Sequence, residues 1–227
     1  MNLLQKTLSF DDVLLIPQMS DITSRKEVDI SSDVLEKKFT LPVISSPMDT
    51  VTGPEMASAI HDAGGFGVIH RYNTIEEQVR LVKNIKADFL SAAVGVAGDY
   101  LERSEELVQA GTSLLCIDVA HGHHANVKNA IESLKNKFGD DVIIMAGNVA
   151  TGEGFSDLEN WGADIIRVGV GGGSICSTRI QTGHGIPTFH SILLSASSAK
   201  RACIVADGGI RNAGDAVKCF AAGADFV

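Results

Sequence analysis

The chain of 227 residues is 44% apolar and 21% charged, and its 19 Lys and Arg against 28 Asp and Glu give a net charge of −9. This composition is that of one soluble globular domain and excludes a disordered or fibrous chain. The negative balance argues against nucleic acid or an anionic membrane as the main partner, because either would require a basic face. A phosphorylated small molecule is still compatible with this charge as a ligand, since backbone N–H groups can bind a phosphate.

Cysteine usage and the N-terminal segment both indicate the reducing cytoplasm. Cys116, Cys176, Cys203 and Cys219 are too few and too scattered for a disulfide framework, and no C-x-x-C pair suggests zinc. Asp11 and Asp12 stand where a signal peptide would be apolar, and no run of about 18 apolar residues occurs. We therefore expect a cytoplasmic protein that is neither exported nor membrane-spanning.

Eight short apolar runs recur along the chain, and most of them end in Gly, Asp, Asn or Ser. They lack the alternation of half-buried strands, which predicts a parallel sheet buried on both faces. The runs begin near Leu41, Phe66, Ser91, Leu114, Val142, Ile165, Cys203 and Asp225. Amphipathic stretches separate them, which indicates an α/β protein. The segment Thr74 to Glu77 is typical of a capping box, and it opens a helix with Ile75, Val79, Val82 and Ile85 on one face.

Most runs start about 22–28 residues after the one before, which is the length of one βα unit. Eight units predict a (β/α)8 TIM barrel over residues 41–227, with residues 1–40 as an N-terminal prelude flanking it. The chain ends at Val227, only three residues into the eighth strand. A barrel cut there has an open edge, so we expect an incomplete barrel that is part of a longer polypeptide.

The longest interval, 38 residues from Ile165 to Cys203, contains the segment GGGSICSTRIQTGHGIP (171–187). It follows a strand at the barrel end where enzymes of this fold place their chemistry. Glycine amides can converge on an oxyanion there, and Cys176 is a nucleophile whose neighbouring hydroxyls and Arg179 favour the thiolate. The polar setting argues against the alternative that Cys176 is a buried apolar side chain; Cys116, Cys203 and Cys219 fit that alternative better.

Polar residues end several other strands of the predicted barrel. Asp207, before Gly208 and Gly209, could accept two hydrogen bonds from a ribose diol, although a helix N-cap is the alternative. Asp118 and Asn148 end two further strands. His121, His123 and His124 suggest a metal site as an alternative. The adjacent His123 and His124 would point in different directions, however, so we expect these histidines to lie at the surface or to support the site, with no metal bound there.

Five motifs in register resemble the inosine monophosphate dehydrogenase and guanosine monophosphate reductase family. They are SSPMDTVT (45–52), GGFGVIH (64–70), AGNVATGE (146–153), GGGSICSTR (171–179) followed by TGHGIP, and VADGGI (205–210). The resemblance extends from SFDDVLLIP to the last residue. It implies a purine nucleoside monophosphate as substrate, NAD as cofactor (NADP in a reductase), potassium, and a homotetramer.

The resemblance also implies a role for each matching residue. Cys176 would attack C2 of the purine beside Thr178, and a hydride would pass between C2 and the nicotinamide. Ser174 and Gly209 would hold the phosphate and Asp207 the ribose hydroxyls, with Ser46, Met48, Asn148 and Arg167 also at the substrate. Asp118 would meet the cofactor ribose. The backbone carbonyls of Gly171, Gly173 and Cys176 match the family's monovalent-cation site.

Two features bear on which branch of the family the chain resembles. Lys86-Ala87-Asp88 leads straight into the third strand, where most dehydrogenases carry a tandem regulatory (CBS) insert. The segments SAAVGVAGDYLER (91–103) and IDVAHGHHANV (117–127) nevertheless resemble the dehydrogenase branch, so we predict an inosine monophosphate dehydrogenase. The alternatives are a guanosine monophosphate reductase and, outside the family, a barrel metal hydrolase or a non-catalytic nucleotide-binding protein.

The active-site loop departs from the family pattern in three places. Gly172 stands where the family mostly has Pro or Ser, and Thr188-Phe189 follows Pro187 where Pro-Gln is usual. His184 also interrupts the pair Gly183 and Gly185. We expect Gly172 to make the loop more flexible.

Overall fold

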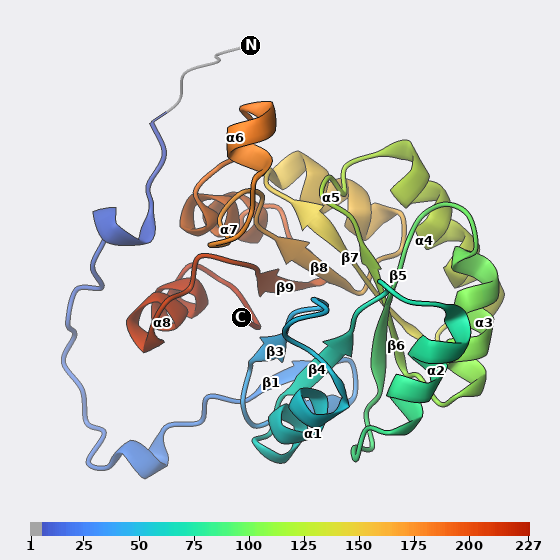
Figure 1. Cartoon of the computed structure of the whole chain (residues 1–227). Coiled ribbons are helices and arrows are strands. Elements are labelled where there is room, and N and C mark those ends of the chain that lie inside the picture. The colour runs from blue at the N-terminus through green and yellow to red at the C-terminus, as the bar shows by residue number, and fades with distance from the viewer. Residues whose placement is uncertain (1–5) are drawn as a thin grey trace.

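A curved sheet of seven parallel strands forms the centre of the computed structural model, which describes residues 6–227 (Figure 1). The strands follow one another in chain order, each hydrogen-bonded to the next. They are β3 (Ile44–Ser45), β4 (Phe66–Ile69), β5 (Ser91–Val94), β6 (Leu114–Asp118), β7 (Ile143–Val149), β8 (Ile165–Val168) and β9 (Cys203–Ala206). Each strand lies on one of the predicted apolar runs, so the α/β barrel class is confirmed.

The last residues of the chain occupy the place of an eighth strand. Phe226 forms a parallel bridge with Val205 on β9. On the other side, Val227 N donates to Pro42 O at 3.0 Å and Ile44 N donates to Val227 O at 2.8 Å. Three residues therefore link β9 to β3 near the start of these strands, and the predicted incomplete barrel is confirmed.

Helices alternate with the strands and cover the outer face of the sheet (Figure 1). They are α1 (Pro54–Asp62), α2 (Ile75–Lys83), α3 (Tyr100–Gln109), α4 (Ala125–Phe138), α5 (Gly152–Asn160), α7 (Thr188–Ala196) and α8 (Ala213–Ala221). A short helix, α6 (Thr178–Thr182), lies within the long segment after β8. No helix of the described residues is long and apolar enough to cross a membrane.

Helix α2 begins where the capping pattern predicts. The Thr74 hydroxyl accepts a hydrogen bond from Glu77 N at 3.2 Å, and Val82 is fully buried against the sheet. The helix ends at Lys83, and β5 begins at Ser91 after a connection of only residues 84–90. That connection holds no inserted domain.

Both faces of the strands are buried, in two separate clusters of side chains. Alternate strand residues such as Val68 and Cys116 point into the barrel, and their neighbours, such as Ile69 and Ile117, pack beneath the helices. Burial on both faces explains why the strands show no polar alternation in the sequence.

A hairpin formed by β1 (Ser32–Val34) and β2 (Lys37–Phe39) covers the N-terminal end of the barrel. Phe39 is buried, and its ring lies 4.8 Å from that of Phe66, 5.2 Å from Phe89 and 5.9 Å from Phe226. The hairpin thus closes the barrel interior with an aromatic cluster, which is worth several kcal/mol in burial alone.

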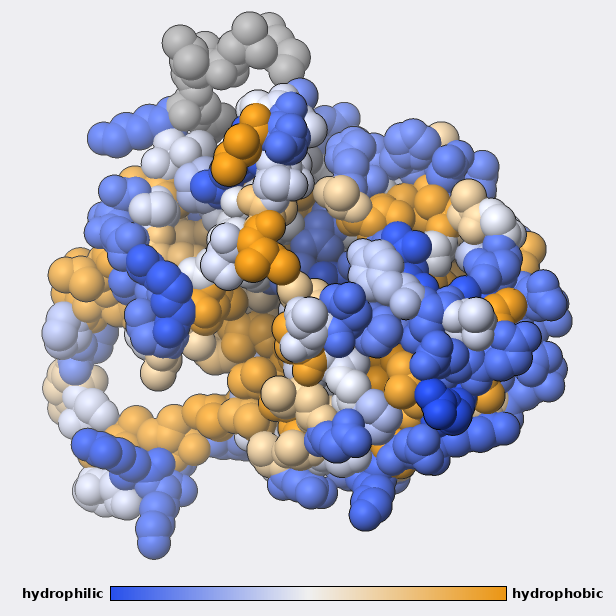
Figure 2. Space-filling model, in the orientation of Figure 1, coloured by the Kyte–Doolittle hydropathy of each residue, from blue (hydrophilic) through white to orange (hydrophobic). Residues whose placement is uncertain are grey.

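The segment before this hairpin reaches the opposite end of the barrel. Phe10, in the 3-10 turn Phe10–Asp12, packs edge-on against Phe189 of α7, with ring centroids 6.0 Å apart. Asp11 pairs with Arg211 at 2.6 Å. Residues 13–31 then run as an extended arm with exposed apolar side chains, Leu14, Ile16 and Met19 among them (Figures 1 and 2). Residues 1–5 of the predicted prelude lie outside the described residues.

We expect Phe39→Ala to lower the free energy of unfolding by about 3–5 kcal/mol, because it leaves a cavity among the three remaining aromatic rings. The measurement is urea unfolding followed by circular dichroism. Leu35→Ala is the matched control, since Leu35 lies on the same hairpin but is exposed, and its effect should stay within about 0.5 kcal/mol. Equal effects of the two substitutions would show that the hairpin does not close the barrel core.

Candidate active site

Polar residues on or just after six of the strands meet at the C-terminal end of the barrel. Because the strands are parallel, their carboxyl ends lie at one mouth. A cavity of about 520 Å³ opens there, within the range of roughly 300–1,000 Å³ typical of small-molecule sites. Ten of the predicted site residues line it: Ser46, Met48, Asp118, Asn148, Arg167, Gly171, Gly173, Cys176, Thr178 and Asp207.

Arg167 on β8 bridges two carboxylates at the floor of this cavity. Its Nη1 donates to Asp118 Oδ1 at 2.5 Å and its Nη2 donates to Asp207 Oδ2 at 2.7 Å. The side chain is buried, which by itself disfavours its charge, but the attractions of Asp207, Cys116 and Asp118 together outweigh burial and raise the pKa of Arg167 above its ordinary value. The guanidinium therefore stays charged and fixes the ends of β6, β8 and β9 relative to one another.

Asn148 holds the same oxygen of Asp207. Its Nδ2 donates to Asp207 Oδ2 at 2.5 Å and to Gly169 O at 2.8 Å. Both hydrogen bonds to the Asp207 carboxylate therefore end on Oδ2, and none of the described residues donates to Oδ1. The carboxylate is held in one orientation with a free oxygen, which suits it to accept a hydrogen bond from a bound hydroxyl.

Asp207 does not serve as the helix cap that was its alternative role. Helix α8 starts later, and its N-cap is Asn212, whose side chain accepts from Asp215 N at 3.0 Å. Gly208 and Gly209 turn the chain between β9 and this helix with φ of +85° and +78°. A Cβ on Gly209 would lie 2.9 Å from Gly172 O, so the turn packs directly on the loop that carries Cys176.

The Cys176 loop is closed at its base. Val170 and Ile186 form an antiparallel bridge, and Arg179 donates to Ile186 O at 3.0 Å. Within the loop, Cys176 N donates to Gly173 O at 3.2 Å. This turn places the Cys176 side chain at the cavity wall, and α6 starts two residues further on, at Thr178.

The surroundings of Cys176 favour its thiolate. The hydroxyl of Thr178 lies 3.3 Å from Cys176 Sγ and lowers the pKa of the thiol, with smaller contributions from backbone N–H groups and the charge of Arg179. Burial instead raises the pKa of Cys116, Cys203 and Cys219 to about 12 each. Of the four thiols, only Cys176 combines a lowered pKa with access to the cavity.

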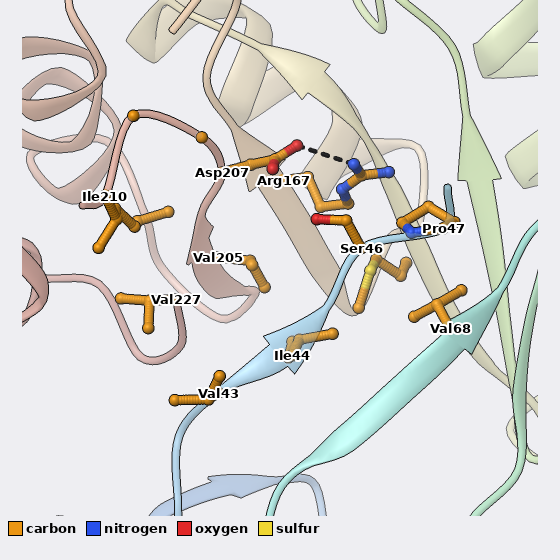
Figure 3. Close-up of a pocket in the computed structure, with 14 residues that line it drawn as sticks. Val43, Ile44, Ser46, Pro47, Val68, Arg167, Val205, Asp207, Ile210 and Val227 are labelled. Atoms are coloured by element: carbon orange, nitrogen blue, oxygen red, sulfur yellow. Dashed lines mark hydrogen bonds and ion pairs between the residues drawn. The ribbon is translucent and has the colours of Figure 1, made fainter. Parts of the chain in front are cut away.

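Ser174 and Gly209 line an adjoining cavity of about 330 Å³ rather than the main one. Gly172 belongs to the walls of both, so the two cavities meet at the glycine loop. A third cavity, of about 290 Å³, opens beside Arg167 and Asp207 between β9 and β3, above Val227 (Figure 3). The predicted residues thus surround one composite site.

Two of the three neighbouring histidines, His123 and His124, have structural partners. His124 is the N-cap of α4 and accepts from Asn126 N at 3.0 Å, whereas His123 Nε2 lies 2.8 Å from Asp157 Oδ2. Within residues 6–227, no group of three or more His, Cys, Asp and Glu side chains could hold a metal ion.

Three residues at the site are absent from the sequence-based predictions. Arg71 and Tyr72 follow β4 and line the main cavity. The Arg71 guanidinium lies 5.4 Å from the centre of the Tyr72 ring, and Arg71 Nε donates a hydrogen bond to Asp118 O at 3.2 Å. Thr188, at the start of α7, lines the adjoining cavity. Arg71 and Tyr72 could have been found, because they directly follow the second apolar run; Thr188 is visible in the sequence only as a departure from the family pattern, which assigns it no role.

Comparisons with known proteins agree on one family. Residues 7–227 match the IMP dehydrogenase / GMP reductase domain. The inosine-5'-monophosphate dehydrogenase of Borreliella burgdorferi is 35% identical, over 98% of this chain and 68% of the relative. The GMP reductase of Mycoplasma mycoides is 36% identical, over 97% of this chain and 70% of the relative. The crystal structure of inosine 5'-monophosphate dehydrogenase from Legionella pneumophila is 44% identical, with a TM-score of 0.91 over 98% of this chain and 68% of that one.

Thr178→Val should raise the pKa of Cys176 and slow its alkylation several-fold at about pH 7.5, because the thiolate loses its hydroxyl donor. The difference should vanish at high pH, where both proteins carry the thiolate. The measurement is the rate of carbamidomethylation of Cys176 against pH, by mass spectrometry of peptides. Thr182→Val is the matched control in the same helix, and equal profiles for all three proteins would contradict the role of Thr178.

Proposed function

The chain belongs to the IMP dehydrogenase / GMP reductase family, and from this premise we propose that it oxidises inosine 5'-monophosphate to xanthosine 5'-monophosphate with NAD. It is an oxidoreductase of purine nucleotide metabolism. The observation that carries the proposal is the position of Cys176, a thiol with a lowered pKa on the wall of the cavity that Asp207 and Asp118 also line.

The substrate would lie across the junction of the two cavities. Asp207 Oδ1 would accept from a ribose hydroxyl, since Oδ2 is already held by Arg167 and Asn148. Ser174 and the backbone of Gly209 would bind the phosphate in the adjoining cavity. Ser46 and Met48, after β3, would contact the nucleotide from the opposite wall of the main cavity.

The proposed reaction starts with addition of the Cys176 thiolate to C2 of the purine. C2 would become tetrahedral and would lose its hydrogen as a hydride, which bound NAD would accept; the substrate would thereby be oxidised by two electrons to a thioimidate. Water then adds at C2, the carbon–sulfur bond breaks, and the thiol returns with release of xanthosine monophosphate. Covalent addition helps because the tetrahedral adduct is a better hydride donor than the aromatic base.

Asp118 would hold the cofactor ribose. Its Oδ1 is paired with Arg167, and it faces the same cavity as Cys176. The carbonyls of Gly171, Gly173 and Cys176 would hold potassium. These donors are neutral oxygens, which suit a monovalent cation, and the carbonyl of Gly173, which already accepts from Cys176 N, retains a second lone pair. Both roles rest on the family resemblance.

The reductase remains the second candidate, with the same Cys176 and with NADPH as hydride donor to guanosine monophosphate. The short connection between α2 and β5 favours it, since it holds no regulatory insert. The 44% identity to a solved dehydrogenase and the dehydrogenase-like segments at 91–103 and 117–127 favour the dehydrogenase. A homotetramer is part of the proposal on the resemblance alone, and a cytoplasmic location is part of it on the cysteine usage and the N-terminal segment.

A paired assay on the purified chain tests the reaction. We expect NADH to form from inosine monophosphate and NAD, with potassium present, and no NADPH consumption with guanosine monophosphate. The reverse pattern would identify the reductase. Absence of both activities, with nucleotide binding retained, would favour the non-catalytic alternative.

Cys176→Ser should abolish turnover and leave the affinity for inosine monophosphate largely unchanged, because the phosphate and ribose contacts do not involve the thiol. Intact mass after incubation with inosine monophosphate and NAD should show the covalent adduct only in the protein with Cys176. Cys219→Ser is the matched control, since that thiol is buried in α8 away from the site. Loss of nucleotide binding in Cys176→Ser would contradict the assigned roles.

A further inference from the structure

Helix α7 begins at Thr188, whose hydroxyl is buried without a hydrogen-bond partner. The residue is 4% exposed, and Thr188 Oγ1 has no partner among the described residues. Buried polar atoms are nearly always hydrogen-bonded, so an unpaired hydroxyl needs a reason. A ligand that supplies the missing partner is one such reason.

The position of Thr188 indicates what kind of ligand this is. Thr188 lines the same cavity as Ser174 and Gly209, the two residues proposed to hold the substrate phosphate. The N-cap of α7 is Pro187, which offers no side-chain cap, so the first N–H groups of this helix are also without side-chain acceptors. Arg179 also lines this cavity, as does Arg211, which is paired there with Asp11. The Thr188 hydroxyl, the N-terminus of α7 and the arginine side chains all favour the binding of an anion in this cavity.

Gly172 is what leaves room for the hydroxyl. A Cβ on Gly172 would lie 2.3 Å from Thr188 Oγ1, far inside van der Waals contact. The backbone at Gly172 does not have the positive φ that would itself require glycine. The glycine is therefore needed for space, and Gly172 and Thr188 form a matched pair in contact.

We propose that the Thr188 hydroxyl donates a hydrogen bond to the phosphate of the bound nucleotide, in the space that Gly172 leaves open. The identity of the anion rests on the proposed function, whereas the site itself rests on the unpaired hydroxyl and the cavity. On binding, the hydroxyl turns from Gly172 toward the phosphate beside Ser174. Thr188 is thus a further substrate-binding residue, supplied by a strand-to-helix junction other than the glycine turn after β9.

The test replaces the hydroxyl with a methyl group of the same shape. Thr188→Val should weaken binding of inosine monophosphate about tenfold or more, the usual effect of losing a hydrogen bond to a charged group. It should leave the affinity for inosine, which has no phosphate, unchanged. Thr188→Ser keeps the donor and should bind the nucleotide like the wild type. Calorimetry with inosine monophosphate, guanosine monophosphate, inosine and inorganic phosphate gives the dissociation constants.

Ser195→Ala is the matched control. Ser195 lies on the same helix, is fully buried, and also has an unpaired hydroxyl, but it lines none of the cavities described above. It should not change nucleotide affinity. Thr188→Val should also melt at the same or a higher temperature than the wild type without ligand, because it removes an unsatisfied buried group.

The outcomes separate this proposal from the proposed function. Unchanged nucleotide affinity in Thr188→Val, or an equal loss for inosine and inosine monophosphate, overturns the role of Thr188. A wild-type protein that binds inorganic phosphate but neither nucleotide contradicts the proposed function, while weaker phosphate binding in Thr188→Val would still support the anion site.

The pairing with Gly172 has its own readout. Gly172→Ala should lower the melting temperature of the wild type but not that of Thr188→Ala, which lacks the atom that the new methyl group would meet. Equal losses in both backgrounds would show that Gly172 does not serve Thr188.

Discussion

A single buried guanidinium organises the mouth of this barrel. Arg167 pairs with Asp118 on one side and with Asp207 on the other. Without it, two carboxylates at the ends of β6 and β9 would face a largely buried cavity unpaired, a cost of several kcal/mol. The parallel sheet brings these strand ends together in any case, and the charge of Arg167 offsets the repulsion between the two carboxylates. Arg167 also leaves Oδ1 of Asp207 free, so the same carboxylate that forms the ion pair can accept a hydrogen bond from a ligand.

The glycines place the reactive thiol against that framework. A Cβ on Gly209 would lie 2.9 Å from Gly172 O, so the turn after β9 packs directly on the Cys176 loop. The loop is closed at its base by the bridge between Val170 and Ile186. Cys176 therefore sits at a defined distance from Asp207 although its loop is long. Its lowered pKa comes from Thr178 on the adjacent helical turn and not from a base across the cavity.

Local and periodic features could be predicted from the sequence, and tertiary ones could not. The apolar runs, the Thr74 cap and the long interval that contains Cys176 all follow from short-range patterns. The double pairing of Arg167 could not be foreseen, since its partners lie 49 and 40 residues away. Thr188 is visible in the sequence only as a departure from the family pattern, because its buried hydroxyl and its contact with Gly172 arise from the tertiary structure. The closure of the barrel by residues 225–227 likewise depends on pairing with β3, at the other end of the chain.

The central claim is that Cys176 allows a hydride to leave C2 of the purine, and deuterium tracing tests it most directly. Inosine monophosphate labelled with deuterium at C2 would be incubated with NAD and the purified chain, and the reduced nicotinamide analysed by mass spectrometry. The account predicts one deuterium in each NADH formed and none when Cys176 is replaced by Ser. NADH without deuterium would show that the hydride comes from another atom and would contradict the account.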